Sequence, residues 1–199
     1  KRDSIDKKSK QELPCNKKTY YTPLSPNDLT GPAGWSLIYP ELNAIAFDID
    51  STTFTTEILD EFAQFCGIVG QVEEFTKKAM SGQMTFADAL LKRIEILNMH
   101  DETLLQDFLA YMSTRIELTT NFIPLLEQFR KDNKMIFFIS GGFDYFIFPL
   151  LQQTLPSDLC VPEEHIFANR FIFAKDQPAT VDMTRHTAQC GGKAKVINY

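Results

Sequence analysis

Apolar and polar residues alternate along this chain with two different periods, which predict strands and helices in turn. The runs Ala44–Phe47 and Met135–Ile139 are short and apolar, as expected of buried strands in a parallel sheet. Nearer the end, the apolar stretches 166–168 and 171–173 predict two further short strands. Strands separated by helical patterns are typical of an α/β fold.

Helical spacing of apolar residues predicts four helices between the first two strands, over 58–66, 72–80, 85–97 and 104–112. We expect Thr55 or Thr56 to cap the first of them, with Glu57 in its first turn, and Thr85 to open the third. Further helical patterns cover Phe122–Lys131 and 143–151, and another helix is expected to begin at Gly191-Gly192-Lys193.

The four consecutive helices predict a division of the chain into a core and an insert. Residues 43–54 and 116–199 would form the core, and 55–115 a helical cap lying over a site. The alternative is that these helices are part of the main core, and periodicity does not separate the two. Residues 1–42 are polar and rich in Lys, Pro and Ser, which predicts a flexible or irregular lead-in.

Composition excludes several classes of function. The chain has 199 residues, with 20 Lys and Arg against 26 Asp and Glu, so its net charge of −6 gives no reason to expect nucleic acid or an anionic membrane as partner. No apolar run reaches the ~18 residues of a membrane span. The four cysteines are scattered, which favours reduced thiols in the cytoplasm over structural zinc or a disulfide framework. The seventeen phenylalanines suggest a Phe-rich core.

The most informative chemistry follows the first strand, in the segment Asp48-Ile-Asp50-Ser-Thr52. Strand ends of open α/β sheets are where such folds bind ligands. If the strand continued, its alternation would send Asp48 and Asp50 to one face. Two carboxylates so close suit an enzyme with one nucleophilic carboxylate, one proton shuttle and Mg²⁺. The alternative is an ordinary acidic turn.

Two further segments suit a phosphate group. Ser140-Gly141-Gly142 follows a strand and precedes a helix, where backbone N–H groups favour an anion. In Gly191-Gly192-Lys193 an ammonium can neutralise a phosphate oxygen or restrain the charge of a nucleophilic aspartate. Each alone is weak, since a plain tight turn and a solvated lysine are common. Together, and in this order, the three segments favour phosphoryl transfer through an aspartyl-phosphate.

At this level of detail the chain resembles the phosphoserine phosphatase family of the haloacid dehalogenase-like superfamily. The resemblance runs from about Ile45 to Ile197 and rests on Asp48–Thr52, Thr76–Gly82, Phe86 with Leu90 and Arg93-Ile94, Ile139–Phe143, Phe167–Asn169 and Gly191–Ile197. It implies a Rossmann-like α/β parallel sheet core with an inserted helical cap.

The resemblance also implies a role for each matched residue. Asp48 would be the nucleophile, and Asp50 would protonate the leaving hydroxyl, activate water and, with Asp48, hold Mg²⁺. The implied phosphate ligands are Ser140, Gly141 and Lys193. The implied substrate ligands are Glu57 for the amino group, Arg93 for the carboxylate, and Met80 and Phe86 as an apolar wall. A structural ion pair between Glu57 and Arg93 is the alternative.

The implied activity is Mg²⁺-dependent hydrolysis of O-phospho-L-serine to L-serine and phosphate, the last step of serine biosynthesis. Two alternatives are a related phosphatase for another small phosphomonoester and an inactive relative that only binds ligand. A homodimer is compatible with the sequence, which does not establish the oligomeric state.

The family's last acidic motif, Gly-Asp-Gly followed by a further Asp, is not found in these 199 residues. Its aspartates would complete the Mg²⁺ site, so we expect a weakened metal site and a core that is incomplete at the C-terminus. Three explanations stay open: a fragment of a longer protein, which a first residue other than Met also favours, a truncated gene, and a metal-poor binding relative. Asp144 is a smaller departure, expected to point to solvent or cap a helix.

Overall fold

The computed structural model describes residues 41–99, 101–174 and 179–197, with the side chains of Thr76, Ala79 and Met80 outside that description. The predicted lead-in 1–42 therefore lies almost wholly outside the described residues. Within them, strands and helices follow one another as the apolar pattern predicts.

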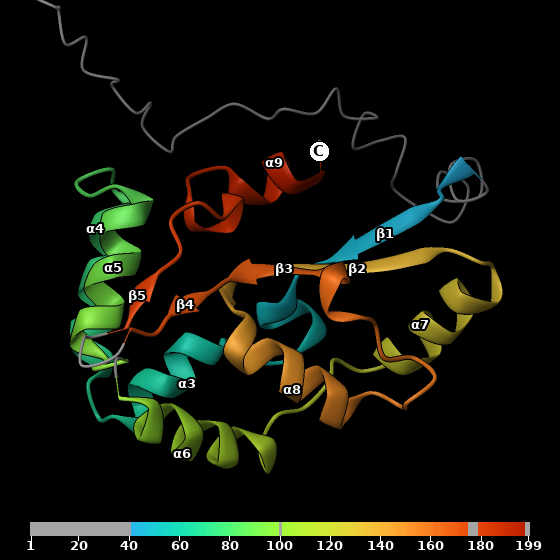
Figure 1. The fold of residues 1–199 in the computed structure, drawn as a ribbon, viewed down its shortest axis with the longest axis horizontal. Helices are drawn as coiled ribbons and strands as arrows, with labels where there is room; N and C mark the ends of the chain where they lie inside the picture. Colours follow the sequence, from blue (N-terminus) through green and yellow to red (C-terminus); the bar gives the residue numbers. More distant parts are fainter. Residues whose placement is uncertain (1–40, 100, 175–178, 198–199) are drawn as a thin grey trace, which may run out of the picture.

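A three-stranded parallel sheet forms the centre of the molecule (Figure 1). Its strands are β1 (Ala44–Phe47), β2 (Met135–Phe143) and β3 (Ile166–Asn169), in the order β1-β2-β3. Ile45 pairs with Ile136, and Phe138 pairs with Ile166. The carboxyl ends of all three strands thus meet at one edge of the sheet, which confirms the predicted parallel arrangement.

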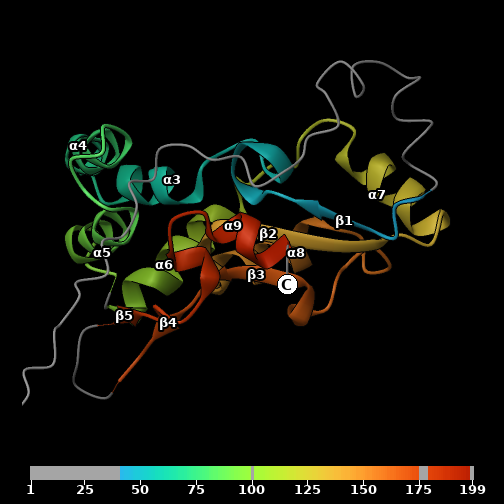
Figure 2. The ribbon, with the colours of Figure 1, turned by 90° about the horizontal axis from the view of Figure 1, so that it is seen from above.

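Helices cover both faces of this sheet. Helices α7 (Phe122–Lys131) and α8 (Asp144–Thr154) lie below it in Figure 1, and the short α9 (Gly192–Ile197) lies above it. Seen from above in Figure 2, α9 crosses over β2 and β3 near their carboxyl ends. This crossing brings the last described helix to the edge where the ligand site is expected.

The insert between β1 and α7 contains the four predicted helices, α3 (Ile58–Phe65), α4 (Val69–Met80), α5 (Phe86–Ile96) and α6 (Glu102–Ser113). Thr85 opens α5 as expected, because its side chain accepts the Asp88 N–H at 3.0 Å. The chain leaves and re-enters the sheet layer side by side, at a bridge between Phe54 and Leu118.

Phenylalanine dominates the interior, as its abundance predicts. Phe62 of α3, Phe108 of α6 and Phe146 of α8 are fully buried, and the ring centroids of Phe62 and Phe108 lie 4.4 Å apart. Phe108 also meets Phe146 edge to face, at 5.2 Å. These contacts join α3 and α6 of the insert to the helix below the sheet, so their apolar faces share one continuous core with it.

Several local predictions were wrong. Glu57, not Thr55 or Thr56, is the residue before α3, and β1 ends at Phe47, so strand alternation does not orient Asp50. A two-stranded antiparallel hairpin joins β4 (Phe171–Ile172) to β5 (Thr180–Val181), of which only the first strand was predicted. These three differences arise where a turn or a long-range pairing overrides the local pattern.

Two further findings concern membrane-spanning helices and the cysteines. No helix among the described residues is long and apolar enough to cross a membrane. Cys66 and Cys160 are free thiols, as expected, whereas Cys190 takes part in a disulfide, so the expectation of reduced thiols is wrong for that residue.

Candidate functional site

A sharp turn at the end of β1 brings the two aspartates of the first motif to one place. The turn spans Ile49–Thr53 and is closed by the Phe54 N–H, which donates to the Ile49 carbonyl at 3.0 Å. Ser51 adopts a positive φ of 52°, and the Thr53 hydroxyl donates to the Asp48 carbonyl at 2.6 Å. The turn, rather than an extended strand, therefore fixes how the carboxylates lie.

Asp48 is held by a backbone amide and by an ammonium group. Its Oδ1 accepts the Ile49 N–H at 2.8 Å, and its Oδ2 forms an ion pair with Lys193 Nζ. Both side chains stay partly open to solvent, with exposures of 37% for Asp48 and 48% for Lys193. This carboxylate is therefore oriented and accessible, as a nucleophile requires.

Lys193 reaches this position because Gly192 allows two backbone segments to touch. A Cβ on Gly192 would stand 1.9 Å from the His186 carbonyl oxygen, so a larger residue would displace α9. The glycine before Lys193 thus serves close packing, which the sequence alone did not indicate.

Asp50 is held by neutral donors in a more buried place. Its Oδ1 accepts the N–H of Ile58, the first residue of α3, at 2.9 Å, and its Oδ2 accepts the Ser140 hydroxyl at 3.1 Å. Asp50 therefore satisfies the helix start that Thr55 or Thr56 was expected to cap. One carboxylate thereby links the first strand, the insert and β2.

The surroundings of Asp50 favour its protonated form. Burial raises the pKa of Asp50 above its ordinary value, and the negative charges of Glu57 and Asp48 add to this effect. The hydrogen bonds from Ile58 and Ser140 oppose it. The two neighbouring carboxylates thus differ in environment, a difference that separates acid and nucleophile roles in active sites.

The Ser140-Gly141-Gly142 segment is part of β2 rather than a turn after it. Ser140 is 1% exposed, and its hydroxyl oxygen accepts the Gly142 N–H at 2.8 Å while donating to Asp50. A Cβ on Gly142 would lie 3.1 Å from that hydroxyl and 3.5 Å from Asp50 Oδ2. Glycine at this position therefore lets the backbone approach the carboxylate.

The insert contributes a second group of charged residues. Glu57 accepts the Ser51 hydroxyl at 2.6 Å, which ties it to the turn beside Asp50. Arg93 is half-buried, and burial lowers its pKa while the charges of Asp60 and Glu57 oppose that shift. Sequence reasoning overlooked Asp60, because a helix surface carboxylate gives no local signal of a partner on another helix.

Of the two residues predicted to form an apolar wall, only Phe86 has a side chain among the described residues. The ring tip of Phe86, Cζ, lies 3.9 Å from where a Cβ on Gly141 would stand, so the start of α5 reaches the Ser-Gly-Gly segment. The side chain of Met80 lies outside the described residues. Phe86 thus connects the insert directly to the edge of the sheet.

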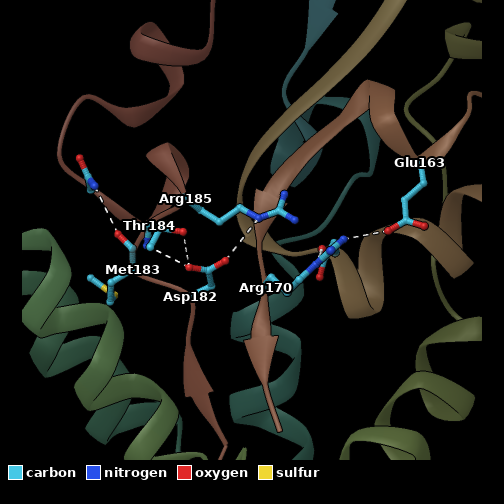
Figure 3. A network of polar contacts seen from close by, with 8 residues as sticks. Glu163, Arg170, Asp182, Met183, Thr184 and Arg185 are labelled. Carbon is cyan, nitrogen blue, oxygen red and sulfur yellow. Dashed lines mark hydrogen bonds and ion pairs between the residues drawn. The ribbon is translucent and has the colours of Figure 1, made fainter.

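Asp144 was expected to point to solvent or cap a helix, but it is the first residue of α8, no side-chain hydrogen bond caps that helix, and its carboxylate is mostly buried in an ion pair. Its Oδ2 accepts the Arg170 Nε–H at 2.7 Å, and its side chain is 12% exposed. Arg170 also reaches Glu163 at 2.8 Å, as Figure 3 shows. The extra carboxylate beside the Ser-Gly-Gly segment is therefore neutralised by a cation from the end of β3.

The oxygen donors at the turn suit a magnesium ion that shares its coordination with substrate and water. Within the described ranges, no group of three or more His, Cys, Asp or Glu side chains is placed to hold a metal. Mg²⁺ is commonly held by one or two carboxylates together with phosphate oxygens and waters. The partly exposed Asp48 carboxylate and the backbone carbonyl of Asp50 supply oxygen ligands of this kind, so the residues present fit the ion.

Comparisons with known proteins bear on the family and the fold of the chain. No protein-family model matches the chain, but it is 34% identical over 163 residues to the phosphoserine phosphatase of Rattus norvegicus, covering 81% of this chain and 69% of the rat enzyme. A substrate-bound phosphoserine phosphatase structure is 25% identical with a TM-score of 0.58, over 79% of this chain and 69% of that one. A phospho-aspartyl intermediate analogue of phosphoserine phosphatase, at 23% identity, gives a TM-score of 0.60 over the same shares. These likenesses confirm the predicted fold class.

Proposed function

Because this chain belongs to the phosphoserine phosphatase family, we propose that it hydrolyses O-phospho-L-serine to L-serine and phosphate. The observation that carries the proposal is the pair Asp48 and Asp50 at the carboxyl edge of the sheet, one paired with Lys193 and the other with Ser140. These two contacts support the proposed roles of Asp48 as nucleophile, Asp50 as proton donor, and Lys193 and Ser140 as phosphate ligands.

In the first step, an oxygen of Asp48 attacks phosphorus, and the bond from phosphorus to the serine oxygen breaks. Asp50 gives its proton to that oxygen, which leaves as the hydroxyl of L-serine. Lys193 and the Ser140–Gly141 segment hold the phosphate oxygens as the phosphoryl group moves onto Asp48. In the second step, Asp50 takes a proton from water, whose oxygen attacks phosphorus and releases Asp48 and phosphate.

The proposed reaction also uses a magnesium ion, which would bind together with the substrate. The Asp48 carboxylate and the Asp50 backbone carbonyl would hold the ion, which supplies positive charge to the phosphate oxygens when bound.

The charged residues of the insert would recognise the amino acid part of the substrate. Glu57 would take the amino group of the substrate and Arg93 its carboxylate, with Phe86 and Met80 excluding water. A homodimer and a cytoplasmic location stay predictions.

The test is phosphate release from O-phospho-L-serine with Mg²⁺, comparing the unaltered chain with Asp48→Asn and with the exposed control Asp107→Asn. The unaltered chain and the control should turn over, and Asp48→Asn should not. Reduction of the enzyme with borohydride during turnover should convert Asp48 alone to homoserine, which mass spectrometry detects. Retained turnover in Asp48→Asn, or a folded chain that releases no phosphate from this substrate, would contradict the proposal.

A further inference from the structure

The pairing of β2 with β3 is irregular at the Ser-Gly-Gly segment. Ile139 lies opposite Phe167 and Phe143 lies opposite Asn169, so β2 advances four residues where β3 advances two. The two additional residues bulge out of the ladder, and Ser140, Gly141 and Gly142 have no β3 residue opposite them in this register. Their backbone groups must find other partners or face solvent.

One side chain from β3 compensates for this irregularity. Asn169 is fully buried, and its Nδ2 donates to the Gly141 carbonyl at 2.7 Å. A carbonyl oxygen only accepts hydrogen bonds, so the NH₂ group of the amide must face Gly141. The Oδ1 of Asn169 has no hydrogen-bond partner among the described residues. Burying a polar amide costs free energy unless it forms hydrogen bonds, and packing alone would favour an apolar residue here. The hydrogen bond to Gly141 is therefore the interaction that accounts for an asparagine at this position.

The bond from Asn169 fixes one end of a single peptide unit whose other end is also held. In a trans peptide the carbonyl of one residue and the N–H of the next point in opposite directions, and the described chain has no cis peptide. Asn169 holds the Gly141 carbonyl, and Ser140 Oγ accepts the Gly142 N–H at 2.8 Å. The plane of the Gly141–Gly142 peptide is therefore set from both sides.

The same contacts form a directed chain that ends on a carboxylate of the site. Asn169 donates to Gly141, Gly142 donates to the Ser140 oxygen, and Ser140 donates to Asp50 Oδ2 at 3.1 Å. Because the Ser140 oxygen accepts from Gly142, its hydrogen is directed to Asp50. Hydrogen bonds in such a series polarise and orient one another.

We propose that Asn169 is a positioning residue for this site, a role that rests on the function proposed above. Its side-chain amide holds the Gly141–Gly142 peptide in the orientation that turns the Ser140 hydroxyl toward Asp50. Asn169 is fully buried, so it acts through the peptide rather than on the substrate. Asp at this position would put an anion against the Gly141 carbonyl, and Leu would leave that carbonyl without its donor.

The first test compares Asn169→Asp and Asn169→Leu with Thr187→Val, using O-phospho-L-serine and p-nitrophenyl phosphate. Thr187 is a matched control, because it is buried and its hydroxyl has no hydrogen-bond partner among the described residues. We expect both Asn169 variants to lose kcat on the order of 10²-fold, as small displacements in active sites do. KM should change by less than about threefold, since no substrate contact is removed. Unchanged kcat in the folded Asn169 variants would overturn the proposal.

The second test needs no substrate, so its outcome is separate from that of the proposed function. In the nuclear magnetic resonance spectrum, the Gly142 amide proton should shift and exchange faster in both Asn169 variants but not in Thr187→Val. If the Asn169 variants do not fold, slow exchange of the Asn169 side-chain amide in the unaltered protein is the expected result. A Gly142 amide that is the same in all variants, or a rapidly exchanging Asn169 amide, contradicts the positioning role.

Discussion

The edge of the sheet and the helical insert hold their charged groups in different ways. At the edge, Asp50 accepts from Ile58 and Ser140 at 2.9 and 3.1 Å, and each donor is fixed by the backbone or by a buried neighbour. In the insert, the charges of Asp60 and Glu57 act on a half-buried Arg93. The edge therefore holds its carboxylate in a fixed geometry, whereas the insert carries a balance of opposite charges, which the proposed function assigns to ligand recognition.

The largest effect is expected from removing the carboxyl group of Asp50, the residue at the edge that we propose as the proton donor. Asp50→Asn keeps an acceptor for the Ile58 N–H, so the fold should persist, but kcat on O-phospho-L-serine should fall by about 10³-fold. With p-nitrophenyl phosphate the burst of p-nitrophenolate should be affected less, because that leaving group needs no proton. Equal losses in the burst and with O-phospho-L-serine would remove Asp50 from the acid role.

Removing the guanidinium group of Arg93 from the insert should change KM more than kcat. Arg93→Ala should raise KM for O-phospho-L-serine by about 10- to 100-fold, which is the loss of affinity expected when a hydrogen bond to a charged group is removed. The change in kcat should be smaller. O-phosphoethanolamine lacks the carboxylate, so its KM should hardly change. The exposed Arg115, which stacks on Tyr111 at 4.4 Å, provides the control Arg115→Ala. An equal loss on both substrates would assign Arg93 a structural role.

A smaller effect on KM is expected from breaking the ion pair between Arg170 and Asp144. Arg170→Ala leaves Asp144 unpaired beside the Ser-Gly-Gly segment, and KM for the anionic substrate should rise about two- to fivefold. Adding Asp144→Asn should restore it, because the uncompensated charge is gone. Arg185, whose Nε lies 3.9 Å from Asp182 Oδ2 (Figure 3), is the matched control. No recovery in the double variant would show that Arg170 acts through packing instead.

The smallest effect concerns the pH dependence of stability in the insert. Burial and the charge of Glu57 raise the pKa of Asp60, so its stabilising contribution is complete below its ordinary value of 3.8 and is lost as pH rises through the raised pKa. Relative to the unaltered chain, Asp60→Asn should gain up to about 0.5 kcal/mol of unfolding free energy between acidic and neutral pH.

Urea titrations at several pH values measure this difference. The charge of Arg93 holds the pKa of Asp60 down, so Arg93→Gln should widen the pH window over which the loss occurs. Parallel stability curves for the unaltered chain and Asp60→Asn would show that Asp60 is not perturbed in the folded state.

Local patterns predicted much of the fold, because each depends on neighbouring residues. Phe122–Lys131 has helical spacing and is α7, and Thr85 caps α5 as its side-chain chemistry requires. The cap of α3 was predicted wrongly, because Asp50, eight residues before Ile58, satisfies the first N–H of the helix. The β4–β5 hairpin was only half predicted, since its pairing depends on two strands with little pattern of their own.

The sequence by itself determined the order of strands and helices, the position of Asp48 and Asp50 after a buried strand, and the glycines near Ser140 and Lys193. Only the tertiary structure decided which donor each carboxylate receives, and that Asn169 holds a peptide 28 residues away in the chain. The physical reason is range: propensity and periodicity act over a few residues, whereas a hydrogen bond between strands exists only after the sheet has brought them together.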